Sequence, residues 1–213
     1  EEALEKLERE RFDIVITMLR VGGMDILAFA HQVKQLAPEV PVVLLAYNVM
    51  DIQGLPVDRG EAVDYIFLWN GDPKILLSIV KLVEDRDNID RDIEIAGVQT
   101  ILLIENSVRF YSVYLPLIYT ELMRQTQTLI GEGVNLTHKL LRMRARPKIL
   151  LATSYEEAQD LYKKYKHNLL GVITDVEFNR DGKAEPQAGI DFAPQVRGEI
   201  PDMPILVQSS SDT

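Results

Sequence analysis

The sequence predicts an α/β protein in which helices cover parallel sheets in two doubly wound domains. Two observations predict this class: helical and strand-like segments alternate along the chain, and the two halves share a repeated pattern. Alternation of this kind is typical of crossover units on a parallel sheet. A length of 213 residues is enough for two domains of ordinary size.

The first half of the chain is expected to alternate between helix and strand. Pro38 stops one of its helices, and the last helix opens with Asp72 and Pro73, which suit the N-cap and the first helical position. The expected elements are a helix over 1–12, a strand over 13–19, a helix over 24–38, strands over 40–47 and 62–69, and a helix over 72–86.

Residues 84–97 are strongly charged and nearly free of large apolar side chains at their centre, so we expect the domain boundary there. The alternation then resumes. Ser154 is placed as an N-cap with Glu157 as its capping-box partner, and two glycines in "GEGVN" are expected to interrupt a long helix. The expected elements are strands over 99–106, 147–154, 169–175 and 203–210, helices over 108–144, 154–166 and 189–199, and a loop after the third strand.

An internal repeat relates the two halves. "EEALEKLERERFDIVITM" matches "EEAQDLYKKYKHNLLGVITD", "GGMDILAFAHQV" matches "QAGIDFAPQV", and "VPVVLLAYN" matches "MPILVQSSS". In this register Met18 aligns with Asp175, and Ala46 aligns with Ser209. The first copy lacks a counterpart of "QTILLIEN" and the second lacks a counterpart of "AVDYIFLW", so we expect the chain to be a fragment of a longer protein.

The amino-acid composition excludes several kinds of partner and site. With 23 basic against 33 acidic residues the net charge is -10, which disfavours nucleic acid as a partner. The absence of cysteine excludes disulfides and thiolate metal sites. The apolar stretch "YSVYLPLIYTELM" is shorter than the roughly 20 residues that a membrane-spanning helix needs. Since the amino terminus is not signal-like, we expect a cytoplasmic protein that does not contact a membrane.

Oxygen-bearing side chains follow the predicted strands of the second half. The carboxyl ends of parallel strands meet at one edge of a sheet, where ligands bind. Mg²⁺ is held there by one or two carboxylates together with water, and a carboxylate beside Mg²⁺ and a hydroxyl is a plausible phosphoryl acceptor. The residues at these strand ends are Glu105, Asn106, Asp175, Glu177, Ser209 and Ser210.

This constellation resembles the receiver domain of bacterial two-component response regulators, and the repeat resembles two such domains in tandem. The resemblance implies two flavodoxin-like domains and a phosphoryl group transferred to Asp175 from a histidine kinase or phosphotransfer protein. It also implies that Mg²⁺ is held by Glu105, Asn106, Asp175 and the backbone carbonyl of Glu177, and that the Ser209 hydroxyl binds the phosphoryl group.

The sequence departs from the family pattern in several places. Asn106 replaces one acid of the metal-binding pair, which should weaken Mg²⁺ binding, and the family's lysine position lies beyond Thr213. In the first copy the acceptor position is Met18, the hydroxyl position is Ala46, and the lysine position falls on Leu68 or Trp69. We therefore expect a degenerate pseudo-receiver over 1–90, without its first strand and helix, and a receiver-like domain over 98–213, without its last strand and helix.

A second resemblance covers residues 101–158. This stretch is similar to the amino-terminal receiver-like region of large bacterial proteins that carry a nucleotide-binding domain of the pyruvate phosphate dikinase or phosphoenolpyruvate synthase type. It implies that the present chain is a regulatory or docking region and not itself an enzyme. Its output would be an attached or partner domain of that catalytic type.

Two other function classes stay open. In the second class both copies are a phosphorylation-independent scaffold for docking or dimerisation, in which Asp175 caps a turn, Glu105 is a solvated acid and Ser209 to Ser211 form a polar turn. In the third class the chain is a Mg²⁺-dependent phosphatase-like enzyme, suggested by "DVEF". That family places an aspartate where Glu177 stands.

Three further features have open interpretations. His138 is expected to lie on a helix surface and not to carry a phosphoryl group. A basic cluster is expected to be a solvated helix face, with an acidic partner as the alternative; it contains Lys139, Arg142, Arg144, Arg146 and Lys148. An apolar helix face is either core or a homodimer surface; it contains Phe110, Tyr114, Leu117, Ile118 and Leu122.

Overall fold

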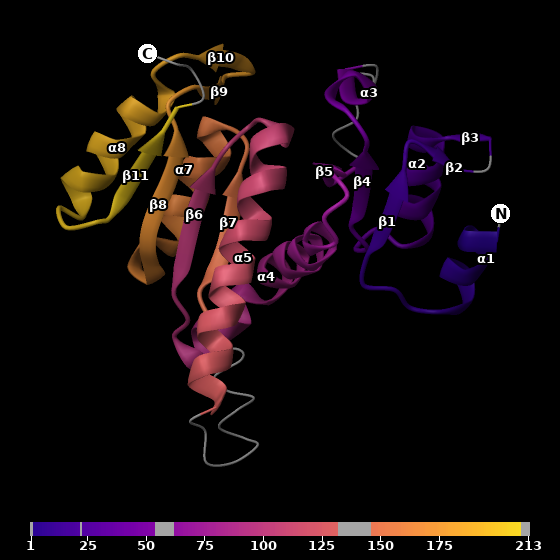
Figure 1. The fold of residues 1–213 in the computed structure, drawn as a ribbon, viewed down its shortest axis with the longest axis horizontal. Coiled ribbons are helices and arrows are strands. Elements are labelled where there is room, and N and C mark those ends of the chain that lie inside the picture. Colours follow the sequence, from indigo (N-terminus) through magenta and orange to yellow (C-terminus); the bar gives the residue numbers. More distant parts are fainter. Residues whose placement is uncertain (1, 22, 54–61, 132–145, 210–213) are drawn as a thin grey trace. The chain divides into compact units, whose positions relative to one another are not determined.

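The computed structural model describes residues 2–21, 23–53, 62–131 and 146–209 (Figure 1). The chain divides into two compact units, Glu1–Val83 and Glu84–Thr213, and each is considered by itself. It is an α/β protein with parallel sheets, as the sequence predicts. In the described ranges, no helix combines the length and the apolar character needed to cross a membrane.

The first unit contains a parallel sheet in the order β1-β4-β5. Its helix α2 begins after the N-cap Asp25, whose carboxylate accepts hydrogen bonds from Leu27 N and Ala28 N, and it ends before Pro38. The elements are α1 Glu2–Arg9, β1 Val15–Met18, β2 Arg20–Val21, β3 Met24–Asp25, α2 Ile26–Leu36, β4 Val42–Ala46, α3 Val49–Gln53, β5 Tyr65–Leu68 and the first part of α4 Lys74–Ala96.

The second unit contains a four-stranded parallel sheet in the order β11-β8-β6-β7. Numbered from its own first strand, this order is 4-3-1-2, which is consistent with the Rossmann and flavodoxin-like class. The elements are the rest of α4, β6 Thr100–Ile104, α5 Val108–Gly131, β7 Lys148–Ala152, α7 Tyr155–Tyr165, the 3₁₀ helix η2 Lys166–Asn168, β8 Leu169–Asp175, β9 Phe178–Arg180, β10 Lys183–Glu185, α8 Ala188–Glu199 and β11 Ile205–Gln208.

The repeated strands pair in the same register in both units. Met18 of β1 lies opposite Leu45 of β4, and Asp175 of β8 lies opposite Gln208 of β11. Leu45 precedes Ala46 and Gln208 precedes Ser209, so the register in the two sheets agrees with the sequence alignment. Met18 and Asp175 therefore end equivalent strands.

One face of the second sheet is covered by helices α7 and α8, which bury aromatic side chains against it. Tyr155 and Tyr162 of α7 each meet Phe192 of α8 edge to face, at ring-centroid distances of 5.8 and 6.0 Å. Helix α7 begins at the expected N-cap, since the Ser154 hydroxyl accepts a hydrogen bond from Glu157 N. The Glu157 carboxylate accepts from Thr153 N, one residue before the cap.

The segment after Asp175 is a hairpin, where the sequence predicted only a loop. Strands β9 and β10 are antiparallel, and Asp181 and Gly182 join them with φ values of 51° and 72°. Positive φ at both central residues defines the tight hairpin turn that an Asp-Gly pair favours. Phe178 is buried at its base and stacks on Tyr155 at 6.2 Å, so the hairpin is anchored to the core.

Residues 84–97 were expected as a boundary. Residues 84–96 form the second half of helix α4, Gly97 follows its end, and the division between the units falls just before residue 84. Asp85 and Asp92 are buried there because they meet buried cations. Asp85 pairs with Arg146 through both carboxylate oxygens, and Lys148 Nζ lies 2.6 Å from Asp92 Oδ2. Asp85 also accepts hydrogen bonds from Tyr119 of α5 and from Ile149 N of β7.

This network corrects the prediction for the basic cluster. Arg146 and Lys148 do not lie on a solvated helix face; both are buried, and Lys148 is the first residue of a strand. Their charges are compensated by the two aspartates of α4, which ties this helix to α5 and β7. Lys139, Arg142, Arg144 and His138 lie outside the described residues.

The buried face of α5 differs from the predicted one. Tyr111, Leu115 and Tyr119 are buried, whereas Leu117 is 64% exposed. The other members of the predicted face, Phe110, Tyr114, Ile118 and Leu122, are half-buried. The core interpretation is therefore wrong for Leu117, and the homodimer surface stays a prediction.

Replacing Asp85 with Asn should destabilise the second unit by about 3 to 5 kcal/mol, because Arg146 and Lys148 would lose part of their compensating charge while buried. Urea unfolding of the full chain measures this cost. Glu121→Gln is the control, since the Glu121–Arg124 pair at 2.7 Å is exposed and should contribute little. Equal midpoints for the two variants would show that the network does not stabilise the fold.

Candidate functional site

Two acidic residues end neighbouring strands at the carboxyl edge of the second sheet. Glu105 follows β6, and Asp175 is the last residue of β8. The strands are parallel, with Ile104 opposite Thr174, so the next residue of each strand lies at the same edge. Strand β6 lies between β7 and β8, so the strand order reverses at β6. In open α/β sheets, ligands bind at the carboxyl ends of the strands beside such a reversal.

The Glu105 carboxyl group is buried, with 1% of the residue exposed. It accepts hydrogen bonds from Ser107 N at 2.9 Å and from the Gln208 side-chain amide at 3.3 Å. Burial raises the pKa of Glu105 to about 7, the negative charge of Asp175 adds to this rise, and the two hydrogen bonds oppose it. Glu105 is therefore poised between its charged and neutral forms near neutral pH.

The Asp175 carboxyl group is also buried and accepts a hydrogen bond from Val176 N at 2.7 Å. Burial raises its pKa above the ordinary value and the charge of Glu177 adds to the rise, while the backbone N–H groups of Val176 and Glu177 oppose it. Two buried carboxyl groups thus lie close enough for their charges to interact, and neither has a cationic side chain among the causes that shift its pKa.

The other predicted site residues lie around this pair. Asn106 directly follows Glu105 and is half-buried. Ser209 is exposed and comes one residue after Gln208, which lies opposite Asp175. Glu177 is exposed, two residues beyond Asp175. The fold therefore brings the predicted residues of all three strand ends to one edge.

The oxygen-bearing side chains at this edge are compatible with Mg²⁺. Within the described ranges, no three or more histidine, cysteine or acidic residues gather as a metal site. Mg²⁺ needs only one or two carboxylates, because it keeps several waters. Glu105 and Asp175 supply two buried carboxyl groups. Burial raises the pKa of both, and the charge of Asp175 raises that of Glu105 further, so a divalent cation would favour their ionised forms. The residues fit this cation.

Two residues of the site were missed by the sequence analysis. Gln208 donates to Glu105 through its side chain, and its backbone carbonyl accepts from Val176 N at 2.9 Å, so it links both acids. Tyr114 of α5 is half-buried. Burial raises its pKa, and the negative charges of Glu105 and Asp175 raise it further. The position of Gln208 directly before Ser209 could have placed it at the site from sequence alone. Nothing in the sequence around Tyr114 indicated that it lies near the two acids.

Gly189 allows the start of α8 to approach the end of strand β8 closely. Its N–H donates to Val176 O at 3.0 Å, and a Cβ at this position would lie 1.9 Å from the backbone oxygen of Asp175. No side chain fits at that distance, so only glycine allows this approach. The close packing fixes the backbone that carries Asp175.

The same edge of the first unit has no acid at the acceptor position. Met18 is partly exposed there, and the Tyr47 hydroxyl donates a hydrogen bond to its sulfur at 3.3 Å. Ala46, at the hydroxyl position, is buried, and Leu68 ends β5. A thioether cannot form an acyl phosphate, so Met18 is not an acceptor.

Comparison with known proteins does not assign the chain to a family. No family model matches it, and no curated protein matches it with significant similarity.

Stability should fall as the pH rises from about 5 to about 7. Between the ordinary pKa of glutamate and the raised pKa of Glu105, the folded chain keeps a proton that the unfolded chain has released, so each rise in pH favours unfolding. Glu105→Gln should remove this dependence, which amounts to roughly 1 to 3 kcal/mol. Chemical unfolding at a series of pH values measures it, and identical slopes for the two proteins would rule out a raised pKa at Glu105.

Gly189→Ala should destabilise the protein by about 1 to 3 kcal/mol, because the new methyl group forces α8 away from the Asp175 backbone. Gly198→Ala in the same helix is the matched control: its added Cβ meets nothing within 4 Å, and alanine should stabilise the helix by up to about 1 kcal/mol. Thermal unfolding compares them. Equal stability of the two variants would contradict the close approach at Gly189.

Proposed function

We propose that the second unit is the phosphoacceptor module of a two-component type phosphorelay, with Asp175 as the acceptor. The observation that supports this most is the pair of buried carboxyl groups, Glu105 and Asp175, at the ends of the adjacent strands β6 and β8. Burying two acids together costs free energy unless a cation or proton offsets it, and such arrangements are typical of functional sites.

In the proposed reaction a carboxylate oxygen of Asp175 attacks the phosphorus of a phosphohistidine. A P–O bond forms, the P–N bond breaks, and its electron pair returns to the imidazole. Mg²⁺ would be held by Glu105, Asn106, Asp175 and the backbone carbonyl of Glu177, and when bound it neutralises charge on the transferring oxygens. The Ser209 hydroxyl donates a hydrogen bond to the phosphoryl group.

Phosphorylation would then change the equilibrium between two conformations, which a partner or attached output domain detects. Gln208 is a suitable relay, since it contacts Glu105 through its side chain and Val176 through its backbone. A histidine kinase or phosphotransfer protein is the proposed donor. A catalytic domain of the pyruvate phosphate dikinase or phosphoenolpyruvate synthase type is the proposed output.

The first unit is proposed to be a degenerate receiver, so that the chain carries two flavodoxin-like domains in tandem. The equal register of β1 with β4 and of β8 with β11 supports a common origin of the two sheets. The partly exposed Met18 in the acceptor position favours a scaffold function for this unit, independent of phosphorylation.

Incubating the chain with acetyl phosphate and Mg²⁺ should add the mass of one phosphoryl group, and Asp175→Asn should abolish the addition. Intact mass spectrometry measures both. Glu177→Gln is the matched control, because only the backbone carbonyl of this residue is used; it should be labelled like the unmodified chain.

Failure to label the unmodified chain, or labelling that survives Asp175→Asn, would leave the phosphorylation-independent scaffold as the better account. Loss of labelling or turnover in Glu177→Gln would instead favour the phosphatase-like enzyme, in which the second acid takes part in the chemistry. A single experiment therefore separates the three function classes.

A further inference from the structure

The β9–β10 hairpin begins directly beside the acid pair. Asp175 ends β8, and Phe178, the first residue of β9, follows after Val176 and Glu177. The backbone N–H of Glu177 lies close enough to the Asp175 carboxyl group to oppose the rise in its pKa. The carbonyl of Glu177, a proposed cation ligand, shares one planar peptide unit with the N–H of Phe178. Turning this carbonyl toward a cation therefore also moves Phe178.

Phe178 cannot move alone, because it is packed in the core. It is fully buried, and its ring stacks on that of Tyr155 at a centroid distance of 6.2 Å, with 17° between the ring planes. Tyr155 of α7 also meets Phe192 of α8, and its hydroxyl donates a hydrogen bond to Gln195 at 3.2 Å. Close-packed side chains transmit a displacement to their neighbours. Tyr155 therefore connects the hairpin to both helices.

The outer part of the hairpin is attached to the same helix start. The guanidinium carbon of Arg180 lies 4.2 Å from the centroid of the Tyr155 ring, within the range of a cation–π contact. Asp181 N, at the turn, donates a hydrogen bond to Glu156 Oε1 at 3.0 Å. Because contacts to α7 occur along β9 and at the turn, we expect the hairpin and the first turn of α7 to move together.

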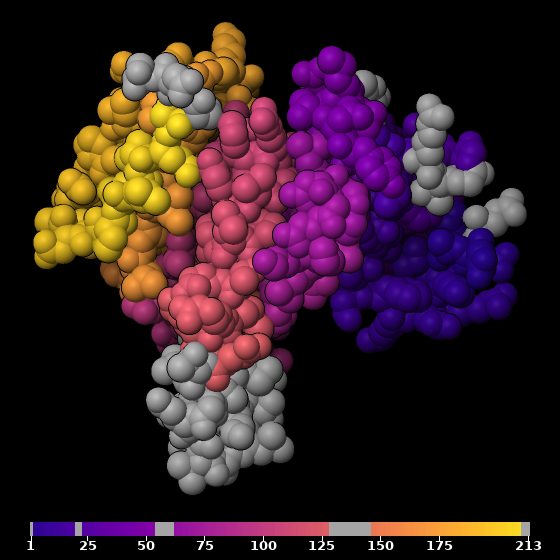
Figure 2. Space-filling view, in the orientation of Figure 1, coloured from indigo at the N-terminus to yellow at the C-terminus, as the bar shows by residue number. Residues whose placement is uncertain are grey.

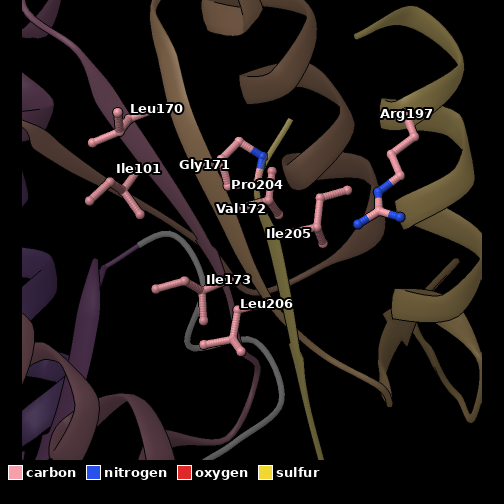
Figure 3. A pocket seen from close by; sticks show the side chains of 9 residues that line it. All are labelled: Ile101, Leu170, Gly171, Val172, Ile173, Arg197, Pro204, Ile205 and Leu206. Atoms are coloured by element: carbon pink, nitrogen blue, oxygen red, sulfur yellow. The ribbon is translucent and has the colours of Figure 1, made fainter. Parts of the chain in front are cut away.

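Strand β10 brings this arrangement to the molecular surface. Lys183 and Ala184 are exposed, and the hairpin, labelled β9 and β10 in Figure 1, projects as orange atoms at the top of Figure 2. The apolar hollow of about 460 Å³ beside β11 is separate from this path: Val172 and Ile205 are among its lining residues, and Asp175 is not (Figure 3). The hairpin is therefore the surface feature that directly continues from the acid site.

The unit without the acid lacks this aromatic anchor. In the first unit the corresponding strands β2 and β3 have two residues each, and residues 19–25 contain no aromatic side chain. Met18 stands there in the acceptor position. The longer hairpin with its buried phenylalanine thus occurs in the unit that has Asp175.

We propose that the β9–β10 hairpin and the start of α7 form a conformational switch, whose position differs between the empty and the occupied acid site. The change begins at the peptide unit between residues 177 and 178, passes through the stacked rings of Phe178 and Tyr155, and reaches the exposed strand β10. A partner that binds one position of the hairpin more tightly would detect the state of the site. This inference rests on the proposed cation site at Glu105 and Asp175.

A single-cysteine reporter tests the switch, because the chain has no cysteine of its own. An environment-sensitive fluorophore is attached to Lys183→Cys on β10, and Mg²⁺ is added to the full chain. The fluorescence should change and should saturate at the Mg²⁺ concentration at which isothermal titration calorimetry shows the site to fill. The same fluorophore on Arg91→Cys, an exposed position of α4, is the control and should not respond.

Two variants test the path. Phe178→Leu fills apolar space but removes the ring stack, so it should keep Mg²⁺ binding and abolish the fluorescence change at position 183. Arg180→Ala removes only a partly exposed contact to Tyr155 and leaves the core unchanged, so it tests the path even where Phe178→Leu does not fold. It should reduce the fluorescence change without affecting Mg²⁺ binding.

The outcomes separate the switch from the site. A fluorophore at position 183 that does not respond while calorimetry records Mg²⁺ binding would overturn the switch and leave the cation site intact. A response that is unchanged in both path variants would do the same. Mg²⁺ binding that is absent, or that survives Asp175→Asn, would overturn the cation site and the switch with it.

Discussion

The parallel pairing of β6 with β8 is the constraint on which the second unit depends. Parallel strands end at the same edge, so Glu105, which follows β6, and Asp175, which ends β8, are brought to one place. Gln208 and Ser209 reach that edge because β11 is parallel to β8 on its other side. Gly189 then allows α8 to begin directly against the Asp175 backbone. A site built in this way is held by strands and not by loops, which favours fixed geometry.

The two ends of this sheet differ in how buried charges are compensated. At the amino end of β7, Asp85 and Asp92 are compensated by Arg146 and Lys148, and the group acts as a structural tie. At the carboxyl end, Glu105 accepts hydrogen bonds from Ser107 N and the Gln208 amide, and Asp175 accepts one from Val176 N. Burial raises the pKa of both acids; the charge of Asp175 adds to the rise at Glu105, and the charge of Glu177 adds to the rise at Asp175. The first arrangement stabilises the fold. In the second, a bound cation would offset the charge of the two acids.

The acid pair and strand β11 are chemically distinct parts of the second sheet. The acid pair offers oxygen atoms to a small cation, whereas the exposed side chains of β11 are apolar. The first unit retains the strand and helix that close the equivalent edge, but it has Met18 in place of the acid.

The strands of the two parallel sheets, most helices and the alignment of Met18 with Asp175 could be predicted from sequence, because apolar runs and repeated motifs are local signals. The short antiparallel strands β2, β3, β9 and β10 were not predicted. The burial of Arg146 and Lys148 could not, since a basic run gives no sign of the distant aspartates that compensate it. The buried face of α5 was misjudged because that helix is apolar on several sides, and the contact between Tyr119 and Asp85 selects one of them. The β9–β10 hairpin had a local signal in Asp181 and Gly182, a residue pair that favours a tight hairpin turn.

The central claim is that Glu105 and Asp175 form one cation-dependent site. Two backbone amides report on it directly, because Ser107 N donates to Glu105 and Val176 N donates to Asp175. In a Mg²⁺ titration followed by ¹⁵N–¹H NMR, both resonances should shift together and saturate at the same concentration, and Asp175→Asn should abolish both shifts. Resonances of Ser107 and Val176 that stay unchanged, or that respond at different concentrations, would contradict the claim.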